Sequence, residues 1–138
     1  MKNYAFILLI FVGFSACSTT DEASPKLSGE INELIIGKWQ LTEYLADPGD
    51  GSGKWQKVAK NQVSTITFGQ NTIEQSENGT KQKGTFTFSE EGGRAGLNIK
   101  IDGNTNVFRW YIGTVTADNL QLSYGCIEAC GGKYVAVK

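Results

Sequence analysis

The chain of 138 residues contains no histidine, the side chain that most often serves as general base or metal ligand near neutral pH. It also lacks a Gly-x-x-x-x-Gly-Lys phosphate loop and a Gly-x-Ser-x-Gly nucleophile motif. Its 13 basic residues are balanced by 14 acidic ones, so no cationic field for nucleic acid is expected. These absences predict a protein that is not an enzyme, has no cofactor or metal and does not bind nucleic acid.

Long hydrophobic runs are also scarce, and the one apolar run, from Tyr4 to Phe14, is well short of the about 20 residues that a membrane span needs. Lys2 precedes this run and small residues follow it, which is typical of an export signal. We expect residues 1–16 to be a signal peptide that is cleaved after Ala16. An uncleaved transmembrane helix and an ordinary signal peptide with an incidental cysteine are the alternatives.

The end of this segment, Phe14-Ser15-Ala16-Cys17, resembles the lipobox of bacterial lipoproteins. The resemblance implies a diacylglyceryl group on the sulfur of Cys17 and acylation of the new amino terminus, with acyl chains such as palmitate. Several acyl chains make a stable membrane anchor, whereas a single chain binds only marginally. The lipid anchor on Cys17 is therefore the expected membrane partner.

Residues 17–27 are small and polar without an apolar period, as in a flexible tether. Ser18 after the anchor resembles lipoproteins that are sorted to the outer membrane, and Asp21 and Glu22 resemble a surface-export tag. We expect the protein in the cell envelope, anchored at the outer membrane, on its periplasmic face or on the cell surface.

Residues 28–138 are predicted to form one domain, in which short alternating segments are separated by Gly, Asn and Asp, as in antiparallel β proteins. Eight or nine strands are expected, preceded by a short helix over Ser28 to Ile36. In the first strand, Trp39, Leu41 and Leu45 are predicted to share one face. An all-β, up-and-down barrel of eight strands is favoured because closure removes exposed edges, and a two-sheet sandwich is the alternative.

Gly37-Lys38-Trp39 resembles the Gly-x-Trp signature of the lipocalins. Leu41, the glycine-rich loop at residues 48–53 and a terminal Cys-x-x-x-Cys make the chain similar to small bacterial lipocalin-like lipoproteins over most of residues 34–138. The resemblance implies an eight-stranded barrel whose closed end is plugged by Trp39 and whose open end takes a small hydrophobic ligand. It includes no ligand-contact motif.

Cys126 and Cys130 lie in a chain that is predicted to be exported, and an oxidising compartment favours a disulfide between them. A redox pair is the alternative, although catalytic dithiols usually have two intervening residues. A zinc site would have only Glu128 nearby as a further ligand. Asp47 and Asp50 lack the ligand spacing of a helix-loop-helix calcium site and predict a turn.

Two functions remain open at this point. The first is a monomeric binder of a small hydrophobic ligand in the barrel. Its expected lining residues are Trp39, Leu41, Phe86, Phe88, Phe108 and Trp110. The second is a structural module with a solid core that contacts another envelope protein or a glycan through Tyr44, Trp55 and Tyr111. A cavity of several hundred cubic ångströms, roughly the size of known ligand sites, favours the first.

Overall fold

The structure, a computed structural model, describes residues 30–138. The predicted signal peptide (1–16), the predicted lipid anchor Cys17 and the predicted tether (17–27) lie outside the described residues. Within the described part, no helix is both long and apolar enough to span a bilayer.

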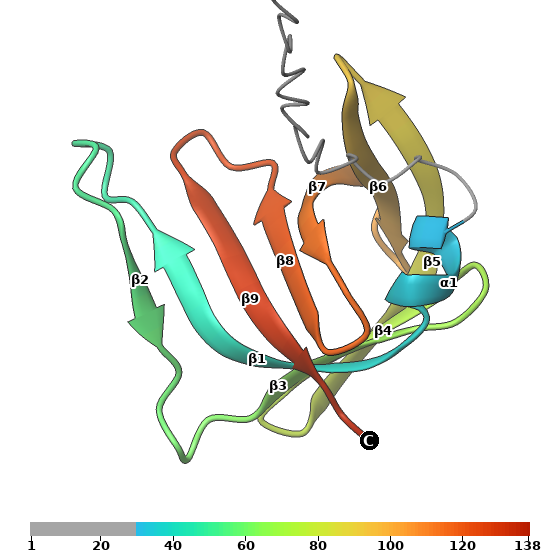
Figure 1. Ribbon diagram of the computed structural model, residues 1–138, viewed down its shortest axis with the longest axis horizontal. Coiled ribbons are helices and arrows are strands. Elements are labelled where there is room, and N and C mark those ends of the chain that lie inside the picture. Colours follow the sequence, from blue (N-terminus) through green and yellow to red (C-terminus); the bar gives the residue numbers. More distant parts are fainter. Residues whose placement is uncertain (1–29) are drawn as a thin grey trace, which may run out of the picture.

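The described chain consists of one short helix and nine strands (Figure 1). In chain order these are α1 (Glu30–Ile35), β1 (Gly37–Ala46), β2 (Lys54–Lys57), β3 (Ser64–Phe68), β4 (Thr72–Glu77), β5 (Thr80–Glu91), β6 (Arg94–Ile101), β7 (Val107–Val115), β8 (Asn119–Tyr124) and β9 (Cys130–Ala136).

The strands form one antiparallel sheet that closes on itself. From β3 to β9 each strand pairs with the next, and β9 pairs back with β1. On its other edge, β1 pairs with β3 through its first residues and with the short β2 through its last ones. Eight strands therefore make the closed wall, and β2 extends it beside β1. The predicted up-and-down barrel is confirmed, and the β1–β9 pairing is incompatible with the two-sheet alternative.

One end of the barrel is closed by α1 and Trp39. The helix ends at Ile35, where the prediction extended to Ile36, because Gly37 turns the chain into β1 at φ +137°, a conformation that suits glycine. The Trp39 ring is buried, and its Nε1 donates a hydrogen bond to the carbonyl of Ile35 at 2.8 Å. The Gly-x-Trp segment thus ties the first strand to the helix that covers this end.

Apolar side chains fill the barrel next to this closed end. The buried core contains Ile35, Trp39, Ile66, Phe68, Ile73, Phe86, Leu97, Ile99, Leu120, Leu122 and Tyr134. Phe86 packs edge-on against Phe68 and Phe88, with ring centroids 5.3 and 5.4 Å away. This end of the barrel is therefore a packed core.

The predicted facing of β1 is wrong beyond Leu41. Leu41 lies opposite Tyr134 of β9, whereas Tyr44, three residues later, lies opposite Gly132, only two residues away on β9. This irregularity is a β-bulge, and it changes which residues face inward. Tyr44 therefore shares the inner face with Leu41, and Leu45 lies on the outer face opposite Trp55 of β2.

A hairpin turn at Asn78-Gly79 joins β4 and β5; this dipeptide favours such a turn, and both residues have positive φ, 47° and 88°. The next strand, β5, begins directly after this turn at Thr80, and its residues from Thr80 to Thr85 pair with β4. The segment from Thr80 to Lys83 lacks the alternation of apolar and polar residues because polar side chains occupy both of its faces.

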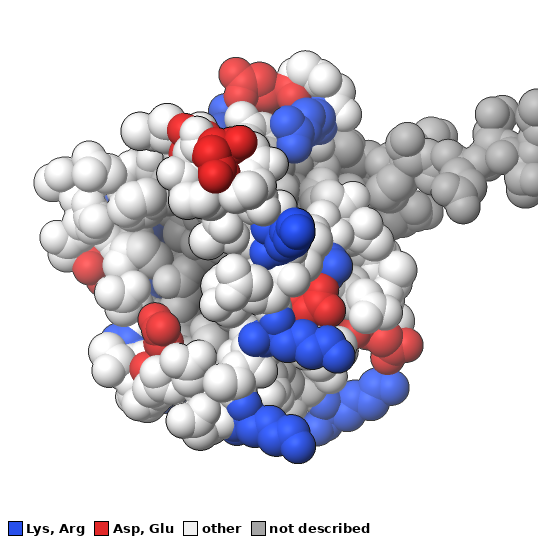
Figure 2. Space-filling view, turned by 90° about the vertical axis from the view of Figure 1, so that its left-hand side faces the viewer, with Lys and Arg blue, Asp and Glu red and all other residues white. Residues whose placement is uncertain are grey.

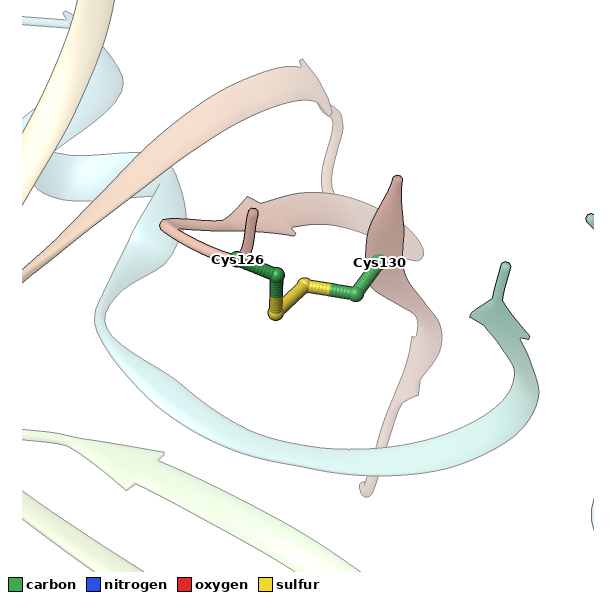
Figure 3. The surroundings of a disulfide bond; sticks show 2 residues. All are labelled: Cys126 and Cys130. Atoms are coloured by element: carbon green, nitrogen blue, oxygen red, sulfur yellow. A yellow bond between two sulfur atoms is a disulfide. The ribbon is translucent and has the colours of Figure 1, made fainter. Parts of the chain in front are cut away.

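Cys126 and Cys130 form a disulfide, which bridges the loop after β8 and the first residue of β9 (Figure 3). The same loop is hydrogen-bonded to the loop after β1, because the amide of Asp47 donates to the carbonyl of Ala129 at 3.0 Å. The disulfide therefore fastens the β8–β9 loop, and the hydrogen bond joins this loop to the loop after β1, at the end of the barrel that lies away from α1.

We expect the double variant Cys126→Ser/Cys130→Ser to lose about 2 kcal/mol of unfolding free energy, because the bond closes a short loop in the unfolded chain. Urea denaturation of wild type and variant measures this loss. Dithiothreitol should reproduce it in the wild type and leave the variant unchanged. Equal stability of the two proteins in the absence of reductant would contradict the prediction.

Candidate ligand-binding cavity

A cavity of about 870 Å³ occupies the half of the barrel that lies away from α1. We call it the mouth cavity. It is lined by Leu41, Tyr44, Val58, Gln62, Val63, Ser64, Thr65, Ile66, Gln75, Ser76, Glu77, Asn78, Thr80, Gln82, Trp110, Tyr124 and Tyr134. The half of the barrel next to α1 is therefore filled with side chains, and the half away from α1 is hollow.

One wall of the mouth cavity is polar and comes from β3, β4 and β5. Ile66, Gln75 and Gln82 lie opposite one another across these three strands, so their side chains share a face. Ile66 belongs to the core, which identifies this face as the inner one. Ser64 and Glu77, two residues along from Ile66 and Gln75, also point inward, toward the open end.

The opposite wall is aromatic and comes from β7, β8 and β9. The rings of Trp110 and Tyr124 lie 5.1 Å apart at 57°, and the hydroxyl groups of Tyr124 and Tyr134 are hydrogen-bonded to each other. Gly132 leaves room for this wall, because a Cβ there would lie 2.6 Å from the Tyr124 hydroxyl and 2.7 Å from Cδ1 of Leu41. The rings of Trp110, Tyr124 and Tyr134 and the side chain of Leu41 together form this aromatic wall of the mouth cavity.

The phenol groups of Tyr124 and Tyr134 in the aromatic wall remain neutral over the physiological pH range. Burial raises the pKa of Tyr134, and the neighbouring Tyr124 raises it further. Burial also raises the pKa of Tyr124, against the opposing effect of its hydrogen bond with Tyr134. Apart from tyrosine, the ionisable side chain in the described lining is Glu77, and the described lining contains no lysine or arginine.

The six residues predicted to line a ligand site lie in three different places. Leu41 and Trp110 line the mouth cavity. Trp39 and Phe86 are in the buried core, and Phe88 packs against it. Phe108, which pairs with Ile99 on the inner face of β7, is 40% exposed and lies outside the cavity lining.

Sequence reasoning missed the tyrosines and glutamines of the cavity. Tyr124 continues the alternation of Leu120 and Leu122 along β8, which was a usable signal for an inward side chain. Gln75 and Gln82 had no such signal, because inward positions of a barrel are expected to be apolar.

The three aromatic residues predicted for surface contacts do not form one patch. Tyr44 lines the mouth cavity and donates a hydrogen bond to Oε1 of Gln56 at 2.9 Å. Trp55 lies outside the barrel under Nζ of Lys133, 4.4 Å from the ring centroid. Tyr111 lies outside on β7 under the guanidinium group of Arg94, at 4.6 Å.

Charged groups of both signs are distributed over the face drawn in Figure 2, among large areas of uncharged residues. Ion pairs join charges of opposite sign on the barrel, among them Lys133 with Glu43 at 2.7 Å and Arg109 with Glu91 at 3.1 Å. This face therefore does not carry a continuous field of one sign.

The glycine-rich loop between β1 and β2 is organised by Asp47. Its Oδ1 accepts hydrogen bonds from the amides of Gly49 (2.9 Å) and Gly51 (3.1 Å), and its Oδ2 accepts one from Gly53 (3.0 Å). The Gly49 amide contributes most to lowering the pKa of Asp47 below its ordinary value of 3.8, followed by that of Gly53. This carboxylate organises a turn, in agreement with the sequence interpretation.

Because the pKa of Asp47 is lower in the folded protein, its hydrogen bonds stabilise the loop fully above the unfolded pKa and are lost as the pH falls through the folded pKa. We expect the amide NMR shifts of Gly49 and Gly53 to titrate with a midpoint below 3.8. Asp47→Asn keeps an acceptor oxygen and should abolish this titration. A midpoint at or above 3.8 would show that the carboxylate is not held by these amides.

A family model described as a lipocalin-like domain matches residues 35–122, from the end of α1 into β8. No curated protein and no solved structure matches the chain. The family match covers more than half of the sequence, and the closed barrel of eight strands is the fold that the resemblance implied. The chain therefore belongs to the lipocalin-like domain family.

Proposed function

We propose that this protein is a lipid-anchored, lipocalin-like binding protein of the cell envelope that takes up a small molecule in the mouth cavity without changing it covalently. The observation that carries the proposal is the cavity itself, about 870 Å³ beside a core that is otherwise packed. Ligand sites typically occupy 300 to about 1,000 Å³. A module with a solid core would have no use for a hollow of this size.

The arrangement of the barrel favours reversible capture. The packed half of the barrel next to α1 and the disulfide-closed β8–β9 loop at the other end hold the walls in place, so little order has to be gained when a ligand enters. Burial of apolar ligand surface against Leu41, Trp110 and Tyr124 would contribute about 25 cal/mol per Å².

The anchor in this proposal rests on the sequence. Lys2, the apolar run from Tyr4 to Phe14 and the residues Ser15-Ala16-Cys17 occur in the order of a lipoprotein signal. Lipidation at Cys17 would hold the barrel at the outer membrane on a tether, so that a ligand is captured close to the membrane surface.

A fluorescent probe tests ligand binding in the mouth cavity. Residues 30–138 close into a barrel with their own core, so the chain from Ser18 to Lys138 is expected to fold without acyl chains. The uncharged dye N-phenyl-1-naphthylamine should bind it with a rise in emission. Gln82→Trp places bulk in the cavity and should abolish the rise, whereas Lys83→Trp, on the outer face of β5, should not.

Failure of the dye to bind the wild type at any concentration would favour the solid module over the binder. Binding that survives Gln82→Trp would place the dye somewhere other than the cavity.

Labelling with palmitate tests the anchor. In the native host, radiolabelled palmitate should be incorporated into the wild type and into Cys126→Ser, and Cys17→Ala should lose the label and leave the membrane fraction. Label retained in Cys17→Ala would refute lipidation at this position.

A further inference from the structure

We infer that the mouth cavity selects an uncharged, hydroxyl-rich ligand of the size of a short saccharide. One face of the ligand would lie on the rings of Trp110 and Tyr124, and its hydroxyl groups would pair with Gln75 and Gln82. This inference rests on the proposed function and adds the chemical class of the ligand.

The charges of the lining exclude ligands that carry a carboxylate or phosphate. Among the described lining residues there is no lysine or arginine to pair with an anion, and Glu77 would repel one. Moving an anion out of water without a partner costs several kcal/mol. Fatty acids therefore fit this cavity poorly, although their hydrocarbon chains would match its aromatic wall.

The amide groups of Gln75 and Gln82 are available for a ligand. They face each other across β4 and β5, and within residues 30–138 neither side chain makes a hydrogen bond to another protein group. Each amide offers two N–H donors and one acceptor oxygen, which is the complement of a pair of hydroxyl groups. Ser64 and Thr80, which also line the cavity, add hydroxyl groups on the same wall.

These amides also discriminate against purely apolar ligands. A hydrocarbon that filled the cavity would strip water from both amides and leave them unpaired, at a cost of about 1–3 kcal/mol each. A ligand with hydroxyl groups replaces the lost water, and sites built to pair with hydroxyl groups reject analogues that lack them.

The opposite wall suits the C–H face of a sugar ring. Trp110 and Tyr124 present large apolar surfaces at an angle of 57°, with the paired hydroxyl groups of Tyr124 and Tyr134 at their edge. Aromatic rings attract polarised C–H groups that lie over their faces. A polar wall facing an aromatic wall therefore matches a molecule with hydroxyl groups at its edge and C–H groups on its face.

Competition and NMR test the inference with the acyl-free chain from Ser18 to Lys138. N-phenyl-1-naphthylamine is first bound to the protein. Glucose, N-acetylglucosamine, maltose, chitobiose and palmitate are then added, each to a separate sample. We expect at least one saccharide to displace the dye and to shift the side-chain amide signals of Gln75 and Gln82, while palmitate does neither. Gln75→Ala/Gln82→Ala should weaken that saccharide about tenfold. The same variant should bind the dye at least as tightly as the wild type, because the dye no longer leaves the two amides unpaired. Gln40→Ala, on the outer face of β1, is the matched control.

Displacement of the dye by palmitate and by none of the saccharides overturns the inference and leaves the proposed function intact. Saccharide binding that is unchanged in the double variant overturns the assignment of the amides. If neither dye nor saccharide binds, the proposed function fails together with the inference. Saccharide shifts at the two amides without dye binding support the inference and, with it, uptake of a small molecule in the mouth cavity.

Discussion

Phe86→Ala is expected to lower the unfolding free energy by about 4 kcal/mol, a large fraction of the stability of a domain of this size. Phe86 is 2% exposed and packs edge-on against Phe68 and Phe88, so truncation leaves a cavity in the packed half of the barrel and removes two ring contacts. Urea denaturation followed by far-ultraviolet circular dichroism measures the change.

Phe108→Ala is the matched control, because Phe108 lies on the same face of the sheet but is 40% exposed. Its truncation is expected to cost about 1 kcal/mol, in proportion to the smaller apolar area that it buries. Where Phe86→Ala is still folded, it should bind N-phenyl-1-naphthylamine as the wild type does. Equal losses of stability in the two variants would contradict the difference in burial between the two rings.

The closed end of the barrel could be predicted from local sequence. Trp39 comes two residues after Gly37, which turns the chain from α1 into β1. The apolar residues of β6 and β8 alternate with polar ones, so the sequence alone shows which residues of these two strands face inward. The Asn78-Gly79 hairpin is equally local, because the two residues themselves favour the backbone angles of the turn.

The open end could not be predicted in this way, because its geometry depends on partners that are distant in sequence. The bulge after Leu41 is visible only in the pairing of β1 with β9, and it turns Tyr44 inward. The start of β5 is polar on both faces, so the alternation that indicates a strand is absent there. The inward polar residues that hide the start of this strand are among those that make the cavity polar.

This connection has a physical basis. A barrel interior that is filled by its own side chains is apolar throughout, whereas one that admits water or a polar ligand needs polar side chains on its inner face. In this protein the inner face changes from apolar to polar along a single strand, from Phe86 and Phe88 to Gln82 of β5. The residue at the change is Gly84.

Gly84→Ala is expected to destabilise the barrel by about 3 kcal/mol or more, because β6 lies too close for a side chain. A Cβ at this position would lie 2.2 Å from the carbonyl oxygen of Lys100 and 3.0 Å from Cα of Ile101, both backbone atoms of the paired strand β6. Neither atom can move without separating β5 from β6. Glycine in a strand often marks such a close approach of two backbones.

Gly113→Ala is the matched control, because Gly113 is also a strand glycine without positive φ. Its Cβ would lie 3.4 Å from Nε2 of Gln121, the flexible end of a side chain. Alanine there should be neutral, or stabilising by up to about 1 kcal/mol through the unfolded state. Urea denaturation of both variants gives the comparison.

Since β5 carries Phe86 on one side of Gly84 and Gln82 on the other, Gly84→Ala should also reduce binding of N-phenyl-1-naphthylamine. A Gly84→Ala variant with wild-type stability and binding would show that the two strands are farther apart at this point than the structure places them.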